Sequence, residues 1–248
     1  MCRQRTLTEP ISASANALCP RLPTTSRSAS FAALSSTWAG MPSVTTWCTV
    51  TAAELLSAAA FSEGKHAQAF PSFGSERSGA PVMSFCRIDD RPIRSREPVT
   101  TPDVLVIQDP TLLHQVSVFE GAEASCRVLI NSARPIGDLN IGEFTSKLPP
   151  GAVVTVPATE LALQYLGKSV PSAALLGGFA ALTGLVTLDS VLAAVAARFA
   201  ARPEIAAGNA QAAWAAFRYV ADTLAELSIG RPASAQNGGR AAVQANAG

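Results

Sequence analysis

The sequence predicts an α/β domain, a three-layer α/β/α sandwich in which helices cover both faces of a mostly parallel sheet. Short, unbroken apolar runs occur at 104–109, 127–132 and 152–158, and this pattern is typical of strands that are buried on both faces. Segments of helical composition alternate with these runs or follow them, as in sheets covered by helices. With 248 residues, 48% of them hydrophobic, the chain is long enough for one large domain with tails.

The first elements follow from local composition. Residues 51–63 are rich in Ala, Leu and Glu and are followed by Gly64, which predicts a helix with a glycine stop. Residues 65–79 contain Gly, Ser, Pro and charged residues, so we expect a connecting loop there. Polar and apolar residues alternate through 81–89, which predicts a strand.

Further helices are predicted between and after the apolar runs, at 110–119, 138–147, 159–166, 172–182, 188–200 and 209–227. The stretch 169–188 has no charged residue and is about as long as a membrane span. Proline and glycine residues interrupt it, and its flanks lack the Lys/Arg asymmetry of a span. A helix buried in a core or a subunit interface is the favoured interpretation.

The two ends of the chain differ in composition from the middle. Residues 1–50 are crowded with Ser, Thr, Pro and Arg, and Glu9 is their only acid. A disordered leader is the favoured interpretation, a transit peptide the second, and translation in a wrong reading frame the third. Residues 230–248 are predicted to be a disordered tail. The predicted organisation is therefore a leader (1–50), an α/β domain (51–229) and a tail (230–248).

Charge and cysteine content exclude several classes of protein. A net charge of +1 with 15% charged residues argues against a nucleic-acid-binding protein. The five cysteines form no C-x-x-C pair and the two histidines lie far apart, so neither a metal site nor a Cys-ligated cluster is predicted. With no secretory signal at the start, we expect a cytoplasmic protein with reduced cysteines.

The loop at 69–82 is the strongest candidate for a binding site. Its sequence, AFPSFGSERSGAPV, combines glycines that permit positive φ with prolines that fix φ. Such a loop can present backbone N–H groups and an arginine to an anion. The candidate binding residues are Ser75, Glu76, Arg77 and Gly79. The alternative is a surface turn in which Glu76 pairs with Arg77 or with neighbours.

Other polar residues carry weaker signals. The segment 87–96 holds four arginines and two aspartates, and a solvated turn with local ion pairs is favoured over a phosphate contact. Asp109 ends an apolar run and could face a ligand, but an N-cap for a helix starting at Pro110 is favoured. Asn131 and Ser132 end the next apolar run, and a capping role is favoured over a ligand contact for them as well.

The remaining candidates are single residues. His66 could act as a general base, but no constellation of nucleophile and carboxylate near it supports that role. His114 is expected to be a core or surface histidine on a helix. Cys86 lies in a predicted strand and is expected to be a small buried residue. No catalytic residue is predicted in this chain.

Six segments in order resemble the gamma subunits, or gamma domains, of the 2-oxoacid:acceptor oxidoreductases, the family of pyruvate:ferredoxin oxidoreductase. They are TAAELL (51–56), EGKHAQAFPSFGSERSGAPV (63–82), FCRIDDRPIR (85–94), PDVLVIQDPTLL (102–113), VLINS (128–132) and AALLGGFAALTGLV (173–186). The resemblance covers roughly residues 51–200, and the block around Ser75–Gly79 is its most specific part.

The resemblance implies a subunit of a complex that oxidatively decarboxylates pyruvate, or a related 2-oxoacid, to its acyl-CoA and reduces ferredoxin. It implies alpha, beta and delta partner subunits that hold thiamine diphosphate, Mg²⁺ and the iron–sulfur clusters, with CoA as co-substrate. This chain would hold none of these cofactors alone. Ser75, Glu76, Arg77 and Gly79 would face CoA or a partner subunit, and no contact with membrane or nucleic acid is implied.

One departure from the family pattern lies just before residue 51. Family members carry a glycine-rich turn there, roughly GRGGQG, between the first strand and the first helix, whereas residues 43–50 read SVTTWCTV. We therefore expect the first strand to be missing or replaced. A frameshift or a wrongly chosen start would leave such a switch, and a non-catalytic remnant or interaction protein is the alternative function.

Overall fold

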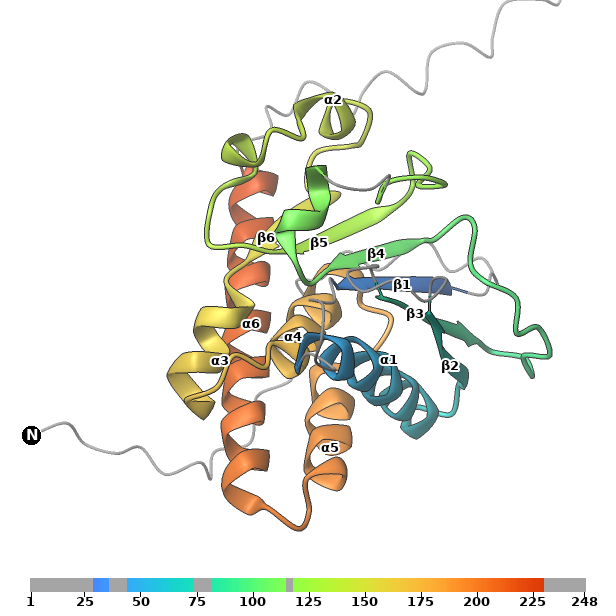
Figure 1. Ribbon diagram of the computed structural model, residues 1–248, viewed down its shortest axis with the longest axis vertical. Coiled ribbons are helices and arrows are strands. Elements are labelled where there is room, and N and C mark those ends of the chain that lie inside the picture. Colours follow the sequence, from blue (N-terminus) through green and yellow to red (C-terminus); the bar gives the residue numbers. More distant parts are fainter. Residues whose placement is uncertain (1–28, 36–43, 74–81, 115–117, 230–248) are drawn as a thin grey trace, which may run out of the picture.

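The computed structural model describes residues 29–35, 44–73, 82–114 and 118–229 (Figure 1). They form a six-stranded sheet of order β2-β3-β1-β4-β5-β6. Its strands are β1 (Ala29–Ser35), β2 (His66–Phe73), β3 (Val82–Asp89), β4 (Val104–Ile107), β5 (Arg127–Asn131) and β6 (Val153–Val156). β1, β4, β5 and β6 are parallel, whereas β3 is antiparallel to both β1 and β2. This arrangement confirms an α/β fold with a mostly parallel sheet.

The strands predicted from apolar runs are confirmed. β4, β5 and β6 consist mostly of Val, Leu and Ile residues and are almost wholly buried, as expected for strands covered on both faces. β3 lies within the predicted 81–89. The loop predicted at 65–79 is wrong over its first part, because His66–Phe73 pairs with β3 along its full length. β2 is an edge strand, where Pro71 is tolerated, so its proline misled the prediction.

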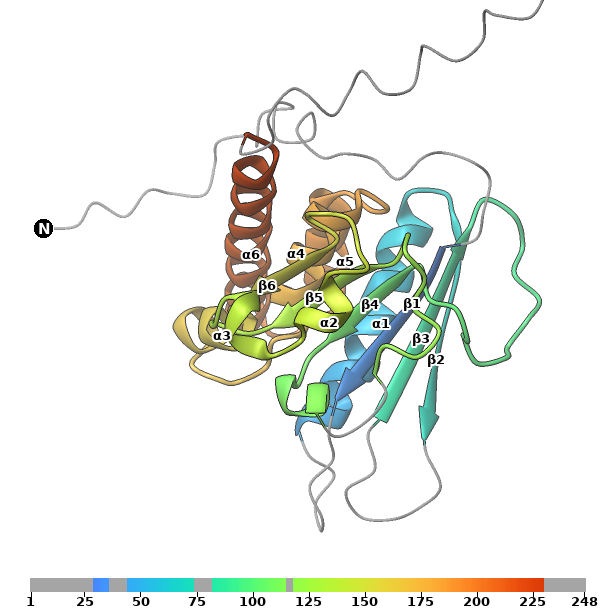
Figure 2. The same cartoon turned by 90° about the horizontal axis from the view of Figure 1, so that it is seen from above.

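The structure differs from the expected leader in two places. β1 lies between β3 and β4 (Figure 2), so a segment of residues 1–50 occupies the place of the first strand. α1 runs from Val44 to Ser62, seven residues longer at its start than predicted. Pairing through main-chain groups needs no particular sequence, which explains how a segment without a strand pattern forms β1. Residues 1–28, 36–43 and 230–248, also predicted to be disordered, lie outside the described residues.

The long helices pack on one face of the sheet (Figure 2). They are α1, α3 (Ala158–Leu166), α4 (Ser172–Thr183), α5 (Leu188–Arg198) and α6 (Pro203–Ile229). All twelve residues of α4 are buried, in a core that also contains residues of α1, α6 and the strands. The prediction of a buried helix at 172–182 is confirmed. No helix in the described ranges is long and apolar enough to cross a membrane.

The other face of the sheet is covered by short elements. These are the 3₁₀ helices η2 (Pro110–His114) and η3 (Ile136–Leu139) and the short helix α2 (Gly142–Thr145). Their apolar residues form a second core with the sheet, in which the rings of Phe119 and Phe144 stack at 3.8 Å. The helices predicted at 110–119 and 138–147 are thus helical turns, and the two helix layers are unequal.

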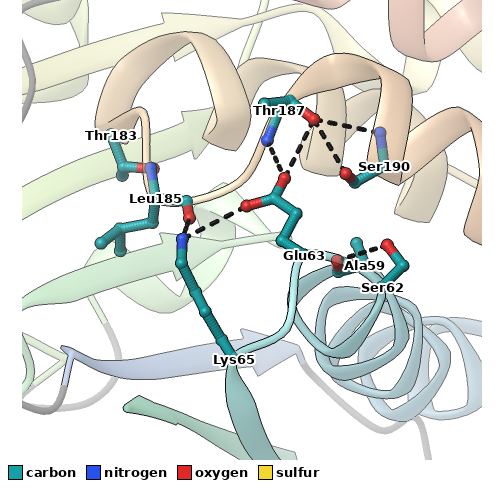
Figure 3. A network of polar contacts seen from close by, with 8 residues as sticks. All are labelled: Ala59, Ser62, Glu63, Lys65, Thr183, Leu185, Thr187 and Ser190. Atoms are coloured by element: carbon teal, nitrogen blue, oxygen red, sulfur yellow. Dashed lines mark hydrogen bonds and ion pairs between the residues drawn. The ribbon is translucent and has the colours of Figure 1, made fainter. Parts of the chain in front are cut away.

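A network centred on Glu63 joins the end of α1 to the start of α5 (Figure 3). The Glu63 carboxylate accepts hydrogen bonds from the Thr187 backbone N–H at 2.6 Å and from the Thr187 hydroxyl at 2.9 Å. Lys65 Nζ lies 3.2 Å from the same carboxylate and also donates to the Leu185 carbonyl. Thr187 in turn caps α5 by accepting from the Ser190 N–H. The network fixes the α1–β2 turn against the α4–α5 connection.

The charge of Glu63 is expected to stabilise the fold at neutral pH. Burial pulls its pKa upward, but hydrogen bonds from Thr187 and Ser190 and the charge of Lys65 outweigh burial, so the pKa lies below its ordinary value of 4.5. A lowered pKa adds stability above the ordinary value, and this stability is lost as pH falls through the folded-state pKa. Glu63→Gln should therefore cost about 1 kcal/mol at pH 7, and the cost should shrink on acidification.

Urea unfolding of the unsubstituted protein and of the Glu63→Gln variant, measured from pH 7 to pH 3, checks this expectation. Glu54→Gln is the matched control, because Glu54 is exposed on the same helix and its substitution should change little. A Glu63→Gln cost that stays constant over the whole pH range would show that the carboxylate charge contributes nothing.

Candidate functional site

The candidate site is the edge of the sheet where the parallel strands end. The pairings Leu34 with Ile107, Ile107 with Ile130, and Asn131 with Val156 place these four strand ends together. α3 begins directly after β6 at this edge. In open α/β sheets, ligands bind outside the carboxyl ends of the strands, so the polar residues here are the first to consider.

The predicted binding loop is attached to the same edge. Ser75, Glu76, Arg77 and Gly79 lie outside the described residues, but the strands on either side of them are described. Phe73, the last residue of β2, pairs with Val82, the first residue of β3, and Val82 pairs with Ser35 at the end of β1. The loop therefore leaves and re-enters the sheet at the edge where Asp109 and Asn131 lie.

Asn131 is the centre of the described polar contacts at this edge. Its side chain, in a residue only 7% exposed, donates through Nδ2 to the Gln108 carbonyl at 2.9 Å and to Thr159 Oγ1 at 2.7 Å. Its Oδ1 accepts from the Thr159 backbone N–H at 3.1 Å, which satisfies one of the free N–H groups at the start of α3. Asn131 thus ties the ends of β4 and β5 to α3. A capping role was expected for Asn131, and its Oδ1 bonds to an N–H at the start of α3 rather than to the helical turn that follows β5.

A second contact joins α1 to the end of β4. The Thr49 hydroxyl donates to Gln108 Oε1 at 3.3 Å, and both residues are buried. We call Thr49, Gln108, Asn131 and Thr159 the edge cluster. Sequence reasoning found only Asn131 among them. The available signal for Gln108 was its position as the polar residue that ends the run VLVI.

Asp109 and Ser132 have local structural roles. Asp109 Oδ1 accepts from the Thr111 backbone N–H at 2.9 Å and from its hydroxyl at 2.7 Å. This confirms the favoured interpretation of Asp109 as a cap, here for η2. Ser132 Oγ accepts from the Arg134 N–H at 3.0 Å, which forms a turn after β5.

The arginine-rich segment 87–96 begins with the last residues of β3 and leaves the sheet at the opposite edge. Arg87 donates to the Glu97 carbonyl at 3.1 Å, and the Arg91 N–H donates to Asp89 at 3.0 Å. These are local contacts, as expected of a turn, and both are hydrogen bonds where ion pairs were expected. His66, at the start of β2, lies at this same edge, away from the candidate site.

Cys86 and Cys126, whose side chains the structure describes, are unsuited to chemistry. Cys86 and Cys126 are both buried and free, which confirms the prediction for Cys86. Burial raises the pKa of the Cys86 thiol to about 12. Burial, with the nearby charge of Asp103, raises the pKa of Cys126 to about 12, against a hydrogen bond from Leu105. Neither thiol is ionised at neutral pH, so neither can act as a nucleophile or metal ligand there.

The edge cluster is suited to hydrogen bonding but not to proton transfer. The edge cluster consists of amides and hydroxyls, which donate and accept hydrogen bonds without changing charge. The described part of the chain contains no group of three or more His, Cys, Asp or Glu residues that could hold a metal ion.

Comparison with known proteins identifies a family and several relatives of this chain. Residues 48–219 match the family model of pyruvate ferredoxin/flavodoxin oxidoreductase. The pyruvate synthase subunit PorC of Methanothermobacter marburgensis is 44% identical over 168 residues, which are 68% of this chain and 88% of that protein. The common subunit gamma of the pyruvate/ketoisovalerate oxidoreductases of Thermococcus kodakarensis is 44% identical over 170 residues, with the same coverage of both chains.

Solved structures agree with these sequence relationships. The pyruvate oxidoreductase subunit PORC of Thermotoga maritima superposes with a TM-score of 0.62 at 28% identity, over 77% of this chain and 96% of that one. A 2-oxoglutarate:ferredoxin oxidoreductase of Magnetococcus marinus shares the fold at 15% identity, with a TM-score of 0.58 over 79% of this chain and 31% of that one. From the family match and the identities of these relatives, we conclude that the chain belongs to the pyruvate ferredoxin/flavodoxin oxidoreductase family.

Proposed function

We propose that this chain is the gamma subunit of a 2-oxoacid:ferredoxin oxidoreductase. The complex would oxidatively decarboxylate pyruvate, or a related 2-oxoacid, to its acyl-CoA and pass the electrons to ferredoxin. The observation that carries this proposal is the match of residues 48–219 to the family, together with relatives named as a pyruvate synthase subunit PorC and as a common subunit gamma of pyruvate/ketoisovalerate oxidoreductases.

Within that complex this chain would bind CoA or a partner subunit, and the partner subunits would carry the redox chemistry. Alpha, beta and delta subunits would hold thiamine diphosphate, Mg²⁺ and the iron–sulfur clusters. Thiamine would supply the carbanion chemistry. We place the complex in the cytoplasm, where the buried free cysteines stay reduced.

The loop that contains Ser75, Glu76, Arg77 and Gly79 would face CoA or a partner subunit. Support comes from its attachment to the carboxyl edge of the sheet, through Phe73 and Val82. A guanidinium group binds phosphate through two parallel hydrogen bonds, and CoA carries phosphates. Arg77 would then be the main charged contact of the loop.

Substitution of Arg77 in the assembled enzyme tests this role. Arg77→Ala should raise the KM for CoA about tenfold or weaken assembly to a similar degree, because a hydrogen bond to a charged group contributes about 1.5–3 kcal/mol. The assays are CoA-dependent viologen reduction with pyruvate and size-exclusion chromatography of the complex. Arg202→Ala is the matched control, because Arg202 is exposed between α5 and α6. An unchanged KM and an intact complex would remove this role from Arg77.

The alternative is a non-catalytic remnant, which the missing glycine-rich turn before residue 51 favours. Anaerobic purification of the tagged chain from its source distinguishes the two proposals. Partners that bear thiamine and clusters, with pyruvate-dependent activity, would establish the subunit. A chain that is recovered alone, from a gene without neighbouring alpha, beta and delta genes, would support the remnant.

A further inference from the structure

The connection between β3 and β4 is much longer than the gap that it bridges. Residues 90–103 join Asp89, at the end of β3, to Val104, at the start of β4, and only β1 lies between these two strands in the sheet. Two strand spacings are about 10 Å, which about three extended residues would span. Figure 2 shows the connection extending outward on the side of β2 and β3, away from β4. Such surplus length is typical of a connection with a function of its own.

The second half of this connection is held in place by β2 and β3. On β3, Arg87 donates to the Glu97 carbonyl at 3.1 Å. On β2, the Gln68 amide, oriented to satisfy both neighbours, accepts from Arg96 Nε at 3.0 Å and donates to the carbonyl of the preceding residue at 2.8 Å. Val99 packs against the second core. The first half, residues 90–94, therefore extends from a fixed base.

The first half of the connection carries guanidinium groups without partners. Residues 87–97 contain four arginines and three acids, in a chain of which only 15% of the residues are charged. In the described part of the chain no arginine of this segment forms an ion pair. Arg87 and Arg96 are bonded to neutral oxygens instead. Arg91 and Arg94 are exposed, and among the described residues their guanidinium groups have no partner, so their donors are free for a group outside the chain.

The chemistry of two exposed guanidinium groups favours carboxylates on separate side chains. Guanidinium binds a carboxylate through two parallel hydrogen bonds, and arginine is enriched at the centres of protein interfaces. Residues 92–96 form no helical turn, so the Cα atoms of Arg91 and Arg94 lie up to about 10 Å apart. This spread suits two acidic side chains better than one small anion. Pro92 and Pro98 fix φ in the segment, which lowers the conformational entropy lost on binding.

From these observations we infer that residues 90–94 dock an acidic segment of a partner subunit, whose Asp or Glu carboxylates bind Arg91 and Arg94. The inference rests on the proposed function, because it places the partner in the same complex. It adds a contact at the edge of the sheet opposite to the loop of Arg77. A solvated turn with no partner is the outcome that the experiments distinguish from it.

Cross-linking of the assembled complex tests which groups meet this segment. The complex would be purified with a tagged full chain that carries Arg91→Lys and Arg94→Lys, which keep the charge and introduce amines. A carbodiimide joins amines to carboxylates in direct contact, and mass spectrometry should find these amines linked to Asp or Glu of a partner subunit. Arg198→Lys with Arg202→Lys is the matched control, because both arginines are exposed, and it should give no such link. An assembled complex in which Arg91→Lys and Arg94→Lys give no link to a partner would overturn the inference.

Charge reversal measures how much the contact contributes to assembly. Arg91→Glu with Arg94→Glu should raise the dissociation constant of the chain from its complex at least about tenfold, and the effect should shrink in about 1 M salt. The Tm of the free chain should stay unchanged, because both side chains are exposed. Arg198→Glu with Arg202→Glu changes the net charge equally and should have a clearly smaller effect.

The two proposals fail in different ways. An equal effect of both charge reversals would overturn the docking segment alone, because assembly would then respond to net charge and not to residues 90–94. An unsubstituted chain that is purified without partner subunits would overturn the proposed function, and the docking segment with it.

Discussion

Gly177→Ala is expected to destabilise the domain by about 3 kcal/mol, because the added methyl group would overlap main-chain atoms of α6. Gly177 lies on α4, where the helix meets α6. A Cβ at this position would lie 1.9 Å from the carbonyl oxygen of Ala213 and 2.6 Å from its carbonyl carbon. Both are main-chain atoms, so the two helices must separate to admit the methyl group. Because α4 is buried along its whole length, separation disturbs contacts on every side.

Gly178→Ala is the matched control for this prediction. The neighbouring Cβ would meet the ends of two side chains, Leu129 Cδ2 at 3.3 Å and Val220 Cγ2 at 3.4 Å. These can shift by a few tenths of an ångström, and alanine gains about 1 kcal/mol over glycine within a helix. The two effects should nearly cancel. Urea unfolding of both variants measures the contrast, and equal stabilities would show that α4 and α6 are not in close contact at Gly177.

The composition of α4 explains why it was predictable as a buried helix. Leu and Phe give the segment its apolar character, and the small residues between them let α6 approach, so the local sequence carries both pieces of information. The strands β4, β5 and β6 were predictable for a similar reason, because runs of Val and Ile are typical of strands that are buried on both faces. The elements that local composition defines are the ones that the structure confirms.

β1 and β2 show where this reasoning stops. β2 contains Pro71 and lies beside glycines and charges, so only its pairing with β3 reveals it as a strand. β1 has no distinctive pattern and owes its place to the two strands that flank it. The edge cluster is similar, because Thr49, Gln108 and Thr159 lie far apart in the sequence and meet only through the order of the strands. Sequence alone could not place partners that topology brings together.

Asn131→Ala is expected to have the second large effect, a loss of about 3 kcal/mol. The substitution removes the bond to the buried Gln108 carbonyl and the bond to the part-buried Thr159 N–H, and an unsatisfied buried group costs about 1–3 kcal/mol. Asn209→Ala is the matched control. Asn209 is equally buried, but its side chain donates only to the Ile205 carbonyl within α6, which already accepts a main-chain bond of the helix. Asn209→Ala should therefore destabilise the protein clearly less than Asn131→Ala.

A double-mutant cycle between Asn131 and Thr159 separates the direct contact from the rest of the network. The Nδ2 to Oγ1 contact of 2.7 Å should give a coupling energy of at least about 0.5 kcal/mol, as residues in one hydrogen-bond network do. Additive losses for Asn131→Ala and Thr159→Ala would contradict a direct contact between these side chains.

The assembled enzyme distinguishes a structural role of Asn131 from a role at the binding edge. Asn131 fixes the start of α3 beside the strand ends, the same edge at which the loop of Arg77 is attached. If that edge faces CoA or a partner subunit, Asn131→Ala should raise the KM for CoA or weaken assembly at temperatures where the variant is still folded. Gly177→Ala lowers stability away from the edge and should leave both quantities unchanged at such temperatures. Equal effects of the two variants on KM and assembly would mean that the carboxyl edge has no special part in binding, and the site would then have to be sought on another face of the chain.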